Sequence, residues 1–294
     1  MTTAAQQPVP EADRDPQKRY TPDGLEVPAP SEHDVLYESR DAIAWVTLNR
    51  PLVLNAVDWS LTLHFGRALE RAAGDDDVRA VIIRGAGRAF CAGGDLQSSP
   101  RPEGLDVPGM PELMQRVWRM PKPVIAAVRG HAVGQGCEIA AMCDLTIASE
   151  DAKFGEIQVR HGFGPPLLIT PYTVGLKAAK ELLLLGEIVE APEALRMGLV
   201  NRVVPGDRLD EAAETMARRL ASLPPTAVAL NKLLVNRVYE LAAFEEALNY
   251  RDVPALMELS GRTRDDRVAA DRLRTLSERG WEAFKEQRDQ AFRE

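Results

Sequence analysis

Two glycine-rich turns, about forty residues apart, carry the backbone groups with the clearest chemical use. The first is the AGGD motif at residues 92–95, which follows a short apolar strand predicted at residues 79–85. The second is the GQG motif at residues 134–136, which stands directly before a predicted helix. Glycine lets the backbone approach a ligand closely, and the first N–H groups of a helix lack an acceptor within it. Two such N–H groups aimed at one point bind an oxyanion, with a contribution of about 3–4 kcal/mol per donor in a buried site.

A carboxylate stands beside the second turn. Glu138 lies three residues after Gln135, on the first turn of the predicted helix. The helix dipole favours a carboxylate at this position, so a purely structural role is open. The same position also suits a general acid or base that acts on a ligand held by the turn. Taken alone, each glycine turn is equally consistent with tight packing of a strand on a helix.

Short apolar strands alternate with helices around these turns. From about residue 34 to residue 205 the strands are apolar without polar alternation, which predicts an α/β core with mostly parallel sheets covered on both faces. Residues 1–33 are rich in proline, glutamine and charge and are predicted to form a flexible leader. Residues 206–294 are predicted to form a helical region. Long helices are expected at residues 174–185, 244–259 (with a kink at Pro254) and 265–294.

Composition limits the classes of function. The 294 residues carry a net charge of −8, which argues against non-specific binding of nucleic acid. The apolar runs are too short to span a bilayer, and the first twenty residues contain no apolar signal core, so neither a membrane nor export is expected. Cys91, Cys137 and Cys143 lack the spacing of a metal site or a disulfide framework. A cytoplasmic protein without a metal is the resulting expectation.

Four segments in a fixed order resemble the crotonase (enoyl-CoA hydratase/isomerase) superfamily. They are AFCAGGDL, GHAVGQGCEIAAMCDLTIAS, AKFG and LLLLGEIVEAPEALRMGLVNRVVP, and VTLNRPLVLNAVD is similar to the N-terminal signature of that family. The resemblance is strong over residues 34–205 and looser over the helical tail. It implies a spiral of repeated ββα units with a C-terminal helical trimerisation region. It also implies a homotrimer, or a hexamer built as a dimer of trimers, that acts on an acyl-CoA thioester and needs no further cofactor.

The resemblance assigns roles to individual positions. The two oxyanion-binding N–H groups are expected at Gly94 and Gln135. Most relatives have glycine at the second position, so the Gln135 side chain is expected to narrow the pocket or add a polar contact. Contacts to the substrate or its CoA moiety are expected from the residues that flank these two: Ala92, Gly93, Asp95, Leu96 and Gly134. Asp95 is also expected to brace its own loop, and Arg50 suits a CoA-phosphate contact and a surface salt bridge equally well.

The acid/base groups follow the hydratase pattern only in part. Glu138 matches the first catalytic glutamate of enoyl-CoA hydratases, whereas an ungapped alignment puts Gln158 at the position of the second. Glutamine neither activates water nor delivers a proton. Three alternatives are open: Glu156 replaces the second glutamate after a small backbone shift, His161 reaches into the site, or Glu138 acts alone. Glu156 is equally consistent with a surface carboxylate, and His161 is better explained as a structural or rim residue.

The expected activity is that of an enoyl-CoA hydratase, the reversible addition of water to a 2-enoyl-CoA. The alternatives are an enoyl-CoA isomerase, or a hydrolase or lyase that acts on an unusual acyl-CoA. A non-catalytic RNA-binding or scaffolding member of the fold is the alternative from another class. The acidic charge and the presence of Glu138 weigh against it. A serine peptidase of related architecture would need a serine nucleophile with a histidine partner, and the sequence offers no convincing serine.

Overall fold

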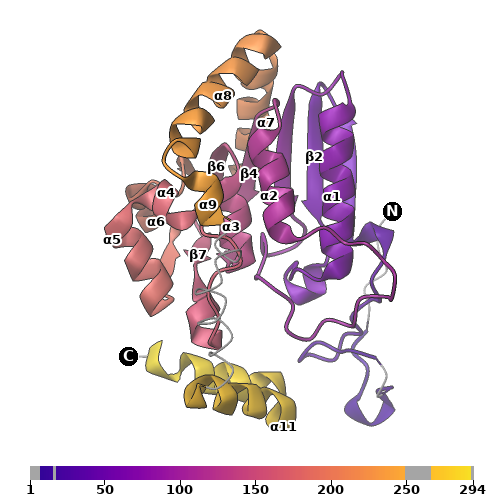
Figure 1. Ribbon diagram of the computed structural model, residues 1–294. Coiled ribbons are helices and arrows are strands. Elements are labelled where there is room, and N and C mark those ends of the chain that lie inside the picture. The colour runs from indigo at the N-terminus through magenta and orange to yellow at the C-terminus, as the bar shows by residue number, and fades with distance from the viewer. Residues whose placement is uncertain (1–6, 16–17, 249–265, 293–294) are drawn as a thin grey trace.

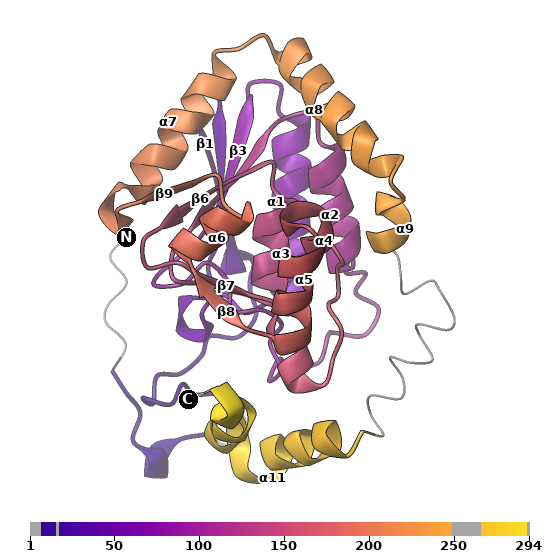
Figure 2. The same ribbon diagram turned by 90° about the vertical axis from the view of Figure 1, so that its left-hand side faces the viewer.

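Two β-sheets organise the protein in the computed structural model, which describes residues 7–15, 18–248 and 266–292 (Figures 1 and 2). The larger sheet has the strand order β1-β2-β3-β4-β6-β9, and the smaller one the order β5-β7-β8. The pairs β1–β2 and β7–β8 are antiparallel, and the other pairs are parallel. The strands are β1 (Val35–Arg40), β2 (Ile43–Leu48), β3 (Ala80–Gly85), β4 (Val124–Val128), β5 (His131–Val133), β6 (Leu145–Ser149), β7 (Lys153–Gly155), β8 (Ile188–Glu190) and β9 (Arg202–Val204).

Helices cover both faces of the larger sheet (Figure 2). Val81 and Ile83 of β3 point into a core shared with α1, α2 and α3, whereas Ala80 and Ile82 point into a core shared with α7. Both faces are therefore buried, which explains why the strands read as continuous apolar runs. The predicted parallel, doubly covered sheet is confirmed. The longer helices are α1 (Trp59–Gly74), α2 (Met110–Arg119), α3 (Gln135–Met142), α6 (Ala191–Met197), α7 (Leu209–Ala221), α8 (Pro225–Glu240) and α11 (Arg267–Asp289).

The chain passes from one sheet to the other in a repeating spiral. β4 is followed by β5 and then α3, and β6 is followed by β7. Isolated parallel bridges, Val57 to Gly94 and Cys91 to Ala132, continue the smaller sheet toward the first glycine turn. The predicted ββα spiral is thus confirmed. Its consequence is that both glycine turns lie along the smaller sheet.

Glycines with a positive φ interrupt two of the predicted long helices. The helix predicted at residues 174–185 begins two residues later, because Gly175, whose φ is 78°, separates α4 (Thr170–Val174) from α5 (Leu176–Lys180), which continues into a π-helical turn (Glu181–Leu185). α11 contains a non-helical Gly280 with φ 79°. Of the helix predicted at residues 244–259, the structure describes only α9 (Phe244–Leu248), and the expected kink at Pro254 lies outside the described residues.

The two predicted end regions contact the core. Arg19, in the segment predicted as a flexible leader, forms an ion pair with Asp95 at 2.7 Å, and Thr21 is buried. At the other end, α7 packs on β2, β3, β4 and β6. It is therefore part of the core layer, although the sequence placed it in the C-terminal helical region. The physical reason is its apolar stripe of Leu209, Ala213 and Ala217, which is buried against the sheet.

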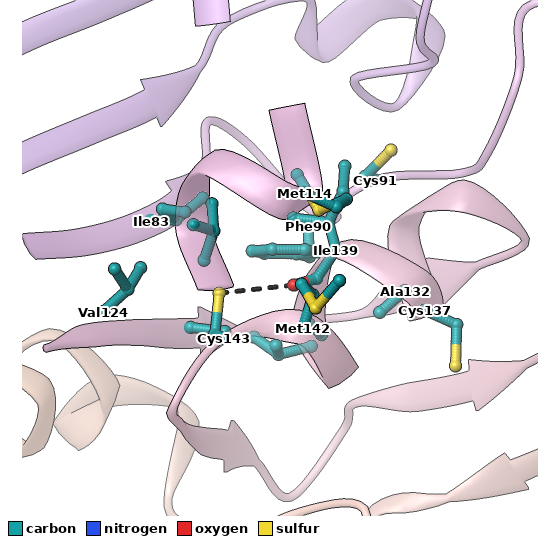
Figure 3. Close-up of a cluster of buried hydrophobic side chains, with 14 of the residues drawn as sticks. Ile83, Phe90, Cys91, Met114, Val124, Ala132, Cys137, Ile139, Met142 and Cys143 are labelled. Atoms are coloured by element: carbon teal, nitrogen blue, oxygen red, sulfur yellow. Dashed lines mark hydrogen bonds between the residues drawn. The ribbon is translucent and has the colours of Figure 1, made fainter. Parts of the chain in front are cut away.

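All three cysteines are free and buried in apolar surroundings (Figure 3). The Sγ of Cys143 donates to the backbone oxygen of Ile139 at 3.2 Å, as expected for a small core residue. Burial raises the pKa of the Cys91 thiol to about 12. Within the described ranges, no cluster of three or more His, Cys, Asp or Glu side chains is arranged to hold a metal ion. None of the described helices is long and apolar enough to cross a membrane.

Candidate active site

The two glycine turns lie against each other. The N–H of Val133 donates to the oxygen of Cys91 at 3.0 Å, and the N–H of Cys91 donates to the oxygen of His131 at 2.9 Å. A Cβ atom on Gly93 would lie 3.0 Å from the oxygen of Val133 and 3.7 Å from the nitrogen of Gln135. Gly93 also has φ +92°, a conformation that side chains disfavour. At Gly93 the two turns therefore pack backbone against backbone, with no room for a side chain.

The start of α3 needs glycine for two separate reasons. Gly134 has φ +56°, and its N–H donates to the oxygen of Gly155 at 2.8 Å. A Cβ atom on Gly136 would lie 2.2 Å from the oxygen of Cys91, closer than any side chain can approach. These contacts hold the first turn of α3 against the AGGD loop.

The N–H groups of Gly94 and Gln135 are both available at this junction. Val57 bonds to the residues on either side of Gly94, donating to Gly93 at 2.7 Å and accepting from Asp95 at 2.9 Å. In such a parallel bridge, the residue between the two bonded ones points its own N–H to the other side. The N–H of Gly94 is therefore turned away from Val57. Gln135 is the first residue of α3, so its N–H has no acceptor within the helix. The Oε1 of Gln135 lies 3.3 Å from the place that a Cβ on Gly94 would occupy, so this side chain crosses to the first turn.

Asp95 anchors the first turn more strongly than the sequence indicated. Its Oδ1 accepts from the N–H of Gln97 at 3.1 Å, as expected for a loop brace. Its Oδ2 also pairs with Arg19 at 2.7 Å and with Arg50 at 3.2 Å. Arg50 is buried and pairs with Asp58 at 2.9 Å as well. The surface alternative for Arg50 is therefore wrong, because its guanidinium lies among buried carboxylates.

Two buried carboxylates share one amide near the start of α3. Gln158 Nε2 donates to Glu138 Oε1 at 3.0 Å and to Glu156 Oε2 at 3.0 Å. The N–H of Leu167 donates to the same Oε1 of Glu138 at 3.2 Å, and the hydroxyl of Thr170 donates to Glu156 Oε1. Glu138 is fully buried and Glu156 is 1% exposed. The surface alternative for Glu156 is wrong, because its carboxyl group is buried and bonded to Thr170 and Gln158.

Burial changes the acidity of Glu156. Loss of solvation raises its pKa to about 7, although the hydrogen bonds from Thr170 and Gln158 act in the opposite direction. A carboxyl group with a pKa near neutrality can exist in either protonation state at physiological pH. No sequence signal distinguishes this position from a surface glutamate, because its burial depends on Thr170, fourteen residues away.

His161 faces the C-terminal helix. Its ring stacks on Phe284 with centroids 5.6 Å apart, and its Nε2 lies 3.1 Å from a guanidinium nitrogen of Arg288. Burial and the neighbouring Arg288 lower its pKa to about 4. Its side chain thus contacts α11, and within the described residues it forms no hydrogen bond with Glu138 or Glu156, which agrees with a structural or rim residue rather than a replacement base.

A cavity of about 490 Å³ lies beside the first turn. Ala92, Gly94, Asp95 and Leu96 line it, whereas Glu138, Glu156, Gln158, Gly93, Gly134 and Gln135 are not part of its lining. Its other walls come from residues 19–22, at the N-terminal end, and from α11. Sequence reasoning missed these walls and their basic side chains, Arg19, Lys285 and Arg288, and it also missed Arg88, which lines the cavity from the loop after β3.

The sequence profile of the enoyl-CoA hydratase/isomerase family matches residues 38–294. A short-chain-enoyl-CoA hydratase from Clostridium acetobutylicum is 36% identical over 75% of this chain and 91% of its own length. A crotonyl-CoA hydratase from Syntrophomonas wolfei is 36% identical over 69% of this chain and 81% of its own. A crystal structure of an enoyl-CoA hydratase/isomerase from Xanthobacter autotrophicus Py2 is 37% identical, with a TM-score of 0.80 over 89% of this chain and 99% of that one.

The fold and the junction of the two turns therefore define a crotonase-fold enzyme. The chain belongs to the enoyl-CoA hydratase/isomerase family.

Proposed function

We propose that the protein catalyses the reversible addition of water to a 2-enoyl-CoA. The observation that carries this proposal is the position of Glu138, three residues after Gln135 on the first turn of α3 and fully buried. The carboxylate and the N–H of Gln135 both belong to this first turn, so we infer that they serve the same bound molecule. The names of the hydratases similar to this chain support the same activity.

The thioester oxygen is bound by the N–H groups of Gly94 and Gln135. As water adds to the β-carbon, negative charge moves from the double bond onto this oxygen. Hydrogen-bond donors that are already in place stabilise the enolate more than the neutral thioester, so they lower the barrier. Glu138 moves the proton. The chemistry needs charge stabilisation and proton transfer only, so CoA enters as part of the substrate and no separate cofactor is invoked.

The cavity supports the binding of the CoA moiety. Ala92, Gly94, Asp95 and Leu96 form the wall at the first turn, which binds the thioester, and Arg88 and Lys285 add positive charge to the lining. Phosphate groups are well matched by arginine and lysine side chains. Gly93 and Gly134 contribute by the close approach of their backbones rather than by contacts of their own.

Apolar side chains on α8 support a homotrimer, or a hexamer formed by two trimers. Five of them are more than half exposed: Leu230, Leu233, Leu234, Val235 and Val238. A contiguous apolar stripe of this kind is typical of a protein–protein interface. The three free, buried thiols support residence in a reducing compartment such as the cytoplasm.

Isomerisation is the second candidate, because a glutamine stands where a second carboxylate was expected and one carboxylate is sufficient to shuttle a proton. A panel of crotonyl-CoA, a 3-enoyl-CoA and a saturated acyl-CoA separates the activities. Hydration of crotonyl-CoA at a rate well above the other two reactions is the expected result. Turnover of the 3-enoyl-CoA alone would establish the isomerase instead, and release of free CoA from the saturated thioester would establish a hydrolase.

A further inference from the structure

Gln158 stands at the centre of the buried carboxylate pair, and its orientation is set by its two neighbours. A primary amide has two N–H groups on one side and one oxygen on the other, and a carboxylate can only accept. The contacts of 3.0 Å to Glu138 and to Glu156 use both N–H groups. A flipped amide would set Oε1 against two carboxylate oxygens. While both carboxylates are ionised, the pair therefore accepts only the orientation with Nε2 toward it.

The oxygen of the same amide is left without a partner. Gln158 Oε1 is buried and accepts no hydrogen bond from any residue in the described part of the chain. Burial of an unsatisfied acceptor costs about 1–3 kcal/mol, which makes an unpaired buried carbonyl oxygen a candidate contact for a ligand. Its location favours this: the Cδ and Nε2 atoms of Gln158 lie 3.9 Å from the place that a Cβ on Gly134 would occupy. The Gln158 amide thus lies beside Gly134, the residue directly before Gln135.

We propose that Gln158 Oε1 accepts a hydrogen bond from the water that adds to the substrate, and that Glu156 is a positioning residue that aims it. This inference rests on the proposed hydration. Gln158 orients the water and exchanges no proton, so Glu138 is the only proton carrier. Glu156 touches no substrate; with Thr170 donating to its other oxygen, it holds the Gln158 amide with Oε1 toward the reacting water.

The proton balance needs one carboxylate only. Glu138 removes one proton from water while the water oxygen bonds to the β-carbon. The electron pair of the double bond moves to the thioester oxygen and forms the enolate. Glu138 then returns the same proton to the α-carbon as the enolate collapses to the thioester. The net change is the addition of one water molecule, and Glu138 ends as it began.

The test compares two reactions that share Glu138 and differ in their need for an oriented water. One is hydration of crotonyl-CoA. The other is exchange of the α-protons of butyryl-CoA in deuterium oxide, followed by NMR, which needs the enolate and the carboxylate alone. In Gln158→Met the kcat of hydration is expected to fall about 100-fold with KM little changed, whereas exchange falls less than about tenfold. An equal loss in both reactions would overturn the role of Gln158 in holding water.

Glu156 is tested by rescue. Glu156→Leu removes the acceptor for Gln158 Nε2, and the kcat of hydration is expected to fall at least about tenfold. Glu156→Gln keeps an acceptor oxygen but cannot transfer a proton, and it is expected to retain kcat within about fivefold. Glu150→Gln, at an exposed glutamate, is the matched control. If Glu156→Gln is as damaging as Glu156→Leu, then Glu156 carries a proton itself and the positioning role is wrong.

The outcomes separate this inference from the proposed function. A natural protein that exchanges the α-protons of butyryl-CoA but hydrates no enoyl-CoA contradicts the proposed hydration. A natural protein that hydrates crotonyl-CoA, with Gln158 and Glu156 variants that do not follow the pattern above, contradicts the inference alone. Because the two Glu156 variants test the orientation independently, the inference stays testable if Gln158→Met does not fold.

Discussion

At the residue scale, Glu156 illustrates how burial alone changes a carboxyl group. Its carboxyl group is hydrogen-bonded to two uncharged side chains, Thr170 and Gln158. Removal from water therefore dominates and raises its pKa to about 7 from an ordinary value of 4.5. Between these two values the folded protein binds a proton that the unfolded chain releases. The contribution of Glu156 to stability is therefore present below about pH 4.5 and is lost as the pH rises through about 7.

We predict that Glu156→Gln becomes more stable relative to the natural protein as the pH rises. Because the amide cannot ionise, the difference in free energy of unfolding should shift in favour of the variant by about 2–3 kcal/mol between about pH 5 and about pH 8. Urea unfolding at both values measures it. Glu150→Gln serves as the control, and a difference for Glu156→Gln that stays constant with pH would contradict the raised pKa.

The sequence located some features of the candidate site and missed others, for a physical reason. Gly94, Gln135 and Glu138 belong to local patterns, since turn geometry and helix starts are encoded by neighbours in the chain. The burial of Glu156 and the surroundings of Arg50 are not local. Arg50 meets carboxylates from three separate segments, and no spacing rule connects them.

At the scale of elements, the first turn of α3 is held in place by the absence of a side chain at Gly136. We predict that Gly136→Ala lowers the free energy of unfolding by about 3 kcal/mol or more, because its Cβ would lie 2.2 Å from the backbone oxygen of Cys91. Activity should fall with it, since α3 must move away from the AGGD loop. Chemical denaturation measures the first effect.

Gly74→Ala is the control for that substitution. Gly74 ends α1 and has no atom within 4 Å of an added Cβ. The control variant should stay within about 1 kcal/mol of the natural protein. Equal stability of the two variants would show that the close contact at Gly136 is not a constraint.

The N-terminal segment forms one wall of the cavity through Arg19. We predict that Arg19→Met raises the KM for crotonyl-CoA about three- to tenfold with little change in kcat, because Arg50 still holds Asp95 in place when the Arg19 ion pair is lost. Lys18→Met, at the position next to Arg19, is the control, because it removes only an exposed ion pair with Glu26. A loss in kcat with unchanged KM would contradict a role in substrate binding.

Helix breaks show what sequence patterns miss at this scale. Apolar periodicity predicted unbroken helices at residues 174–185 and 265–294. Gly175 and Gly280 instead adopt positive φ values and separate helical segments. A single glycine is tolerated in a helix at a modest cost, so periodicity cannot tell a tolerated glycine from a breaking one.

At the scale of the whole molecule, the exposed apolar stripe of α8 is the feature that a single chain does not explain. We predict that Leu234→Glu dissociates the assembly into single subunits, because a charge in an apolar interface is costly to bury. Sedimentation velocity measures the mass. Arg67→Glu, at an exposed position of α1, is the control. A natural protein that already sediments as a single subunit would contradict the proposed trimer.

The central claim is that Glu138 moves the proton while two backbone N–H groups hold the thioester oxygen. The most direct test is the rate of crotonyl-CoA hydration by the natural protein and by Glu138→Gln, together with the affinity of each for the saturated butyryl-CoA. We predict that kcat falls about 10²- to 10⁴-fold while the affinity changes less than about threefold, because the amide keeps the shape of the site and loses the proton transfer. Hydration by Glu138→Gln at the rate of the natural protein would contradict the account.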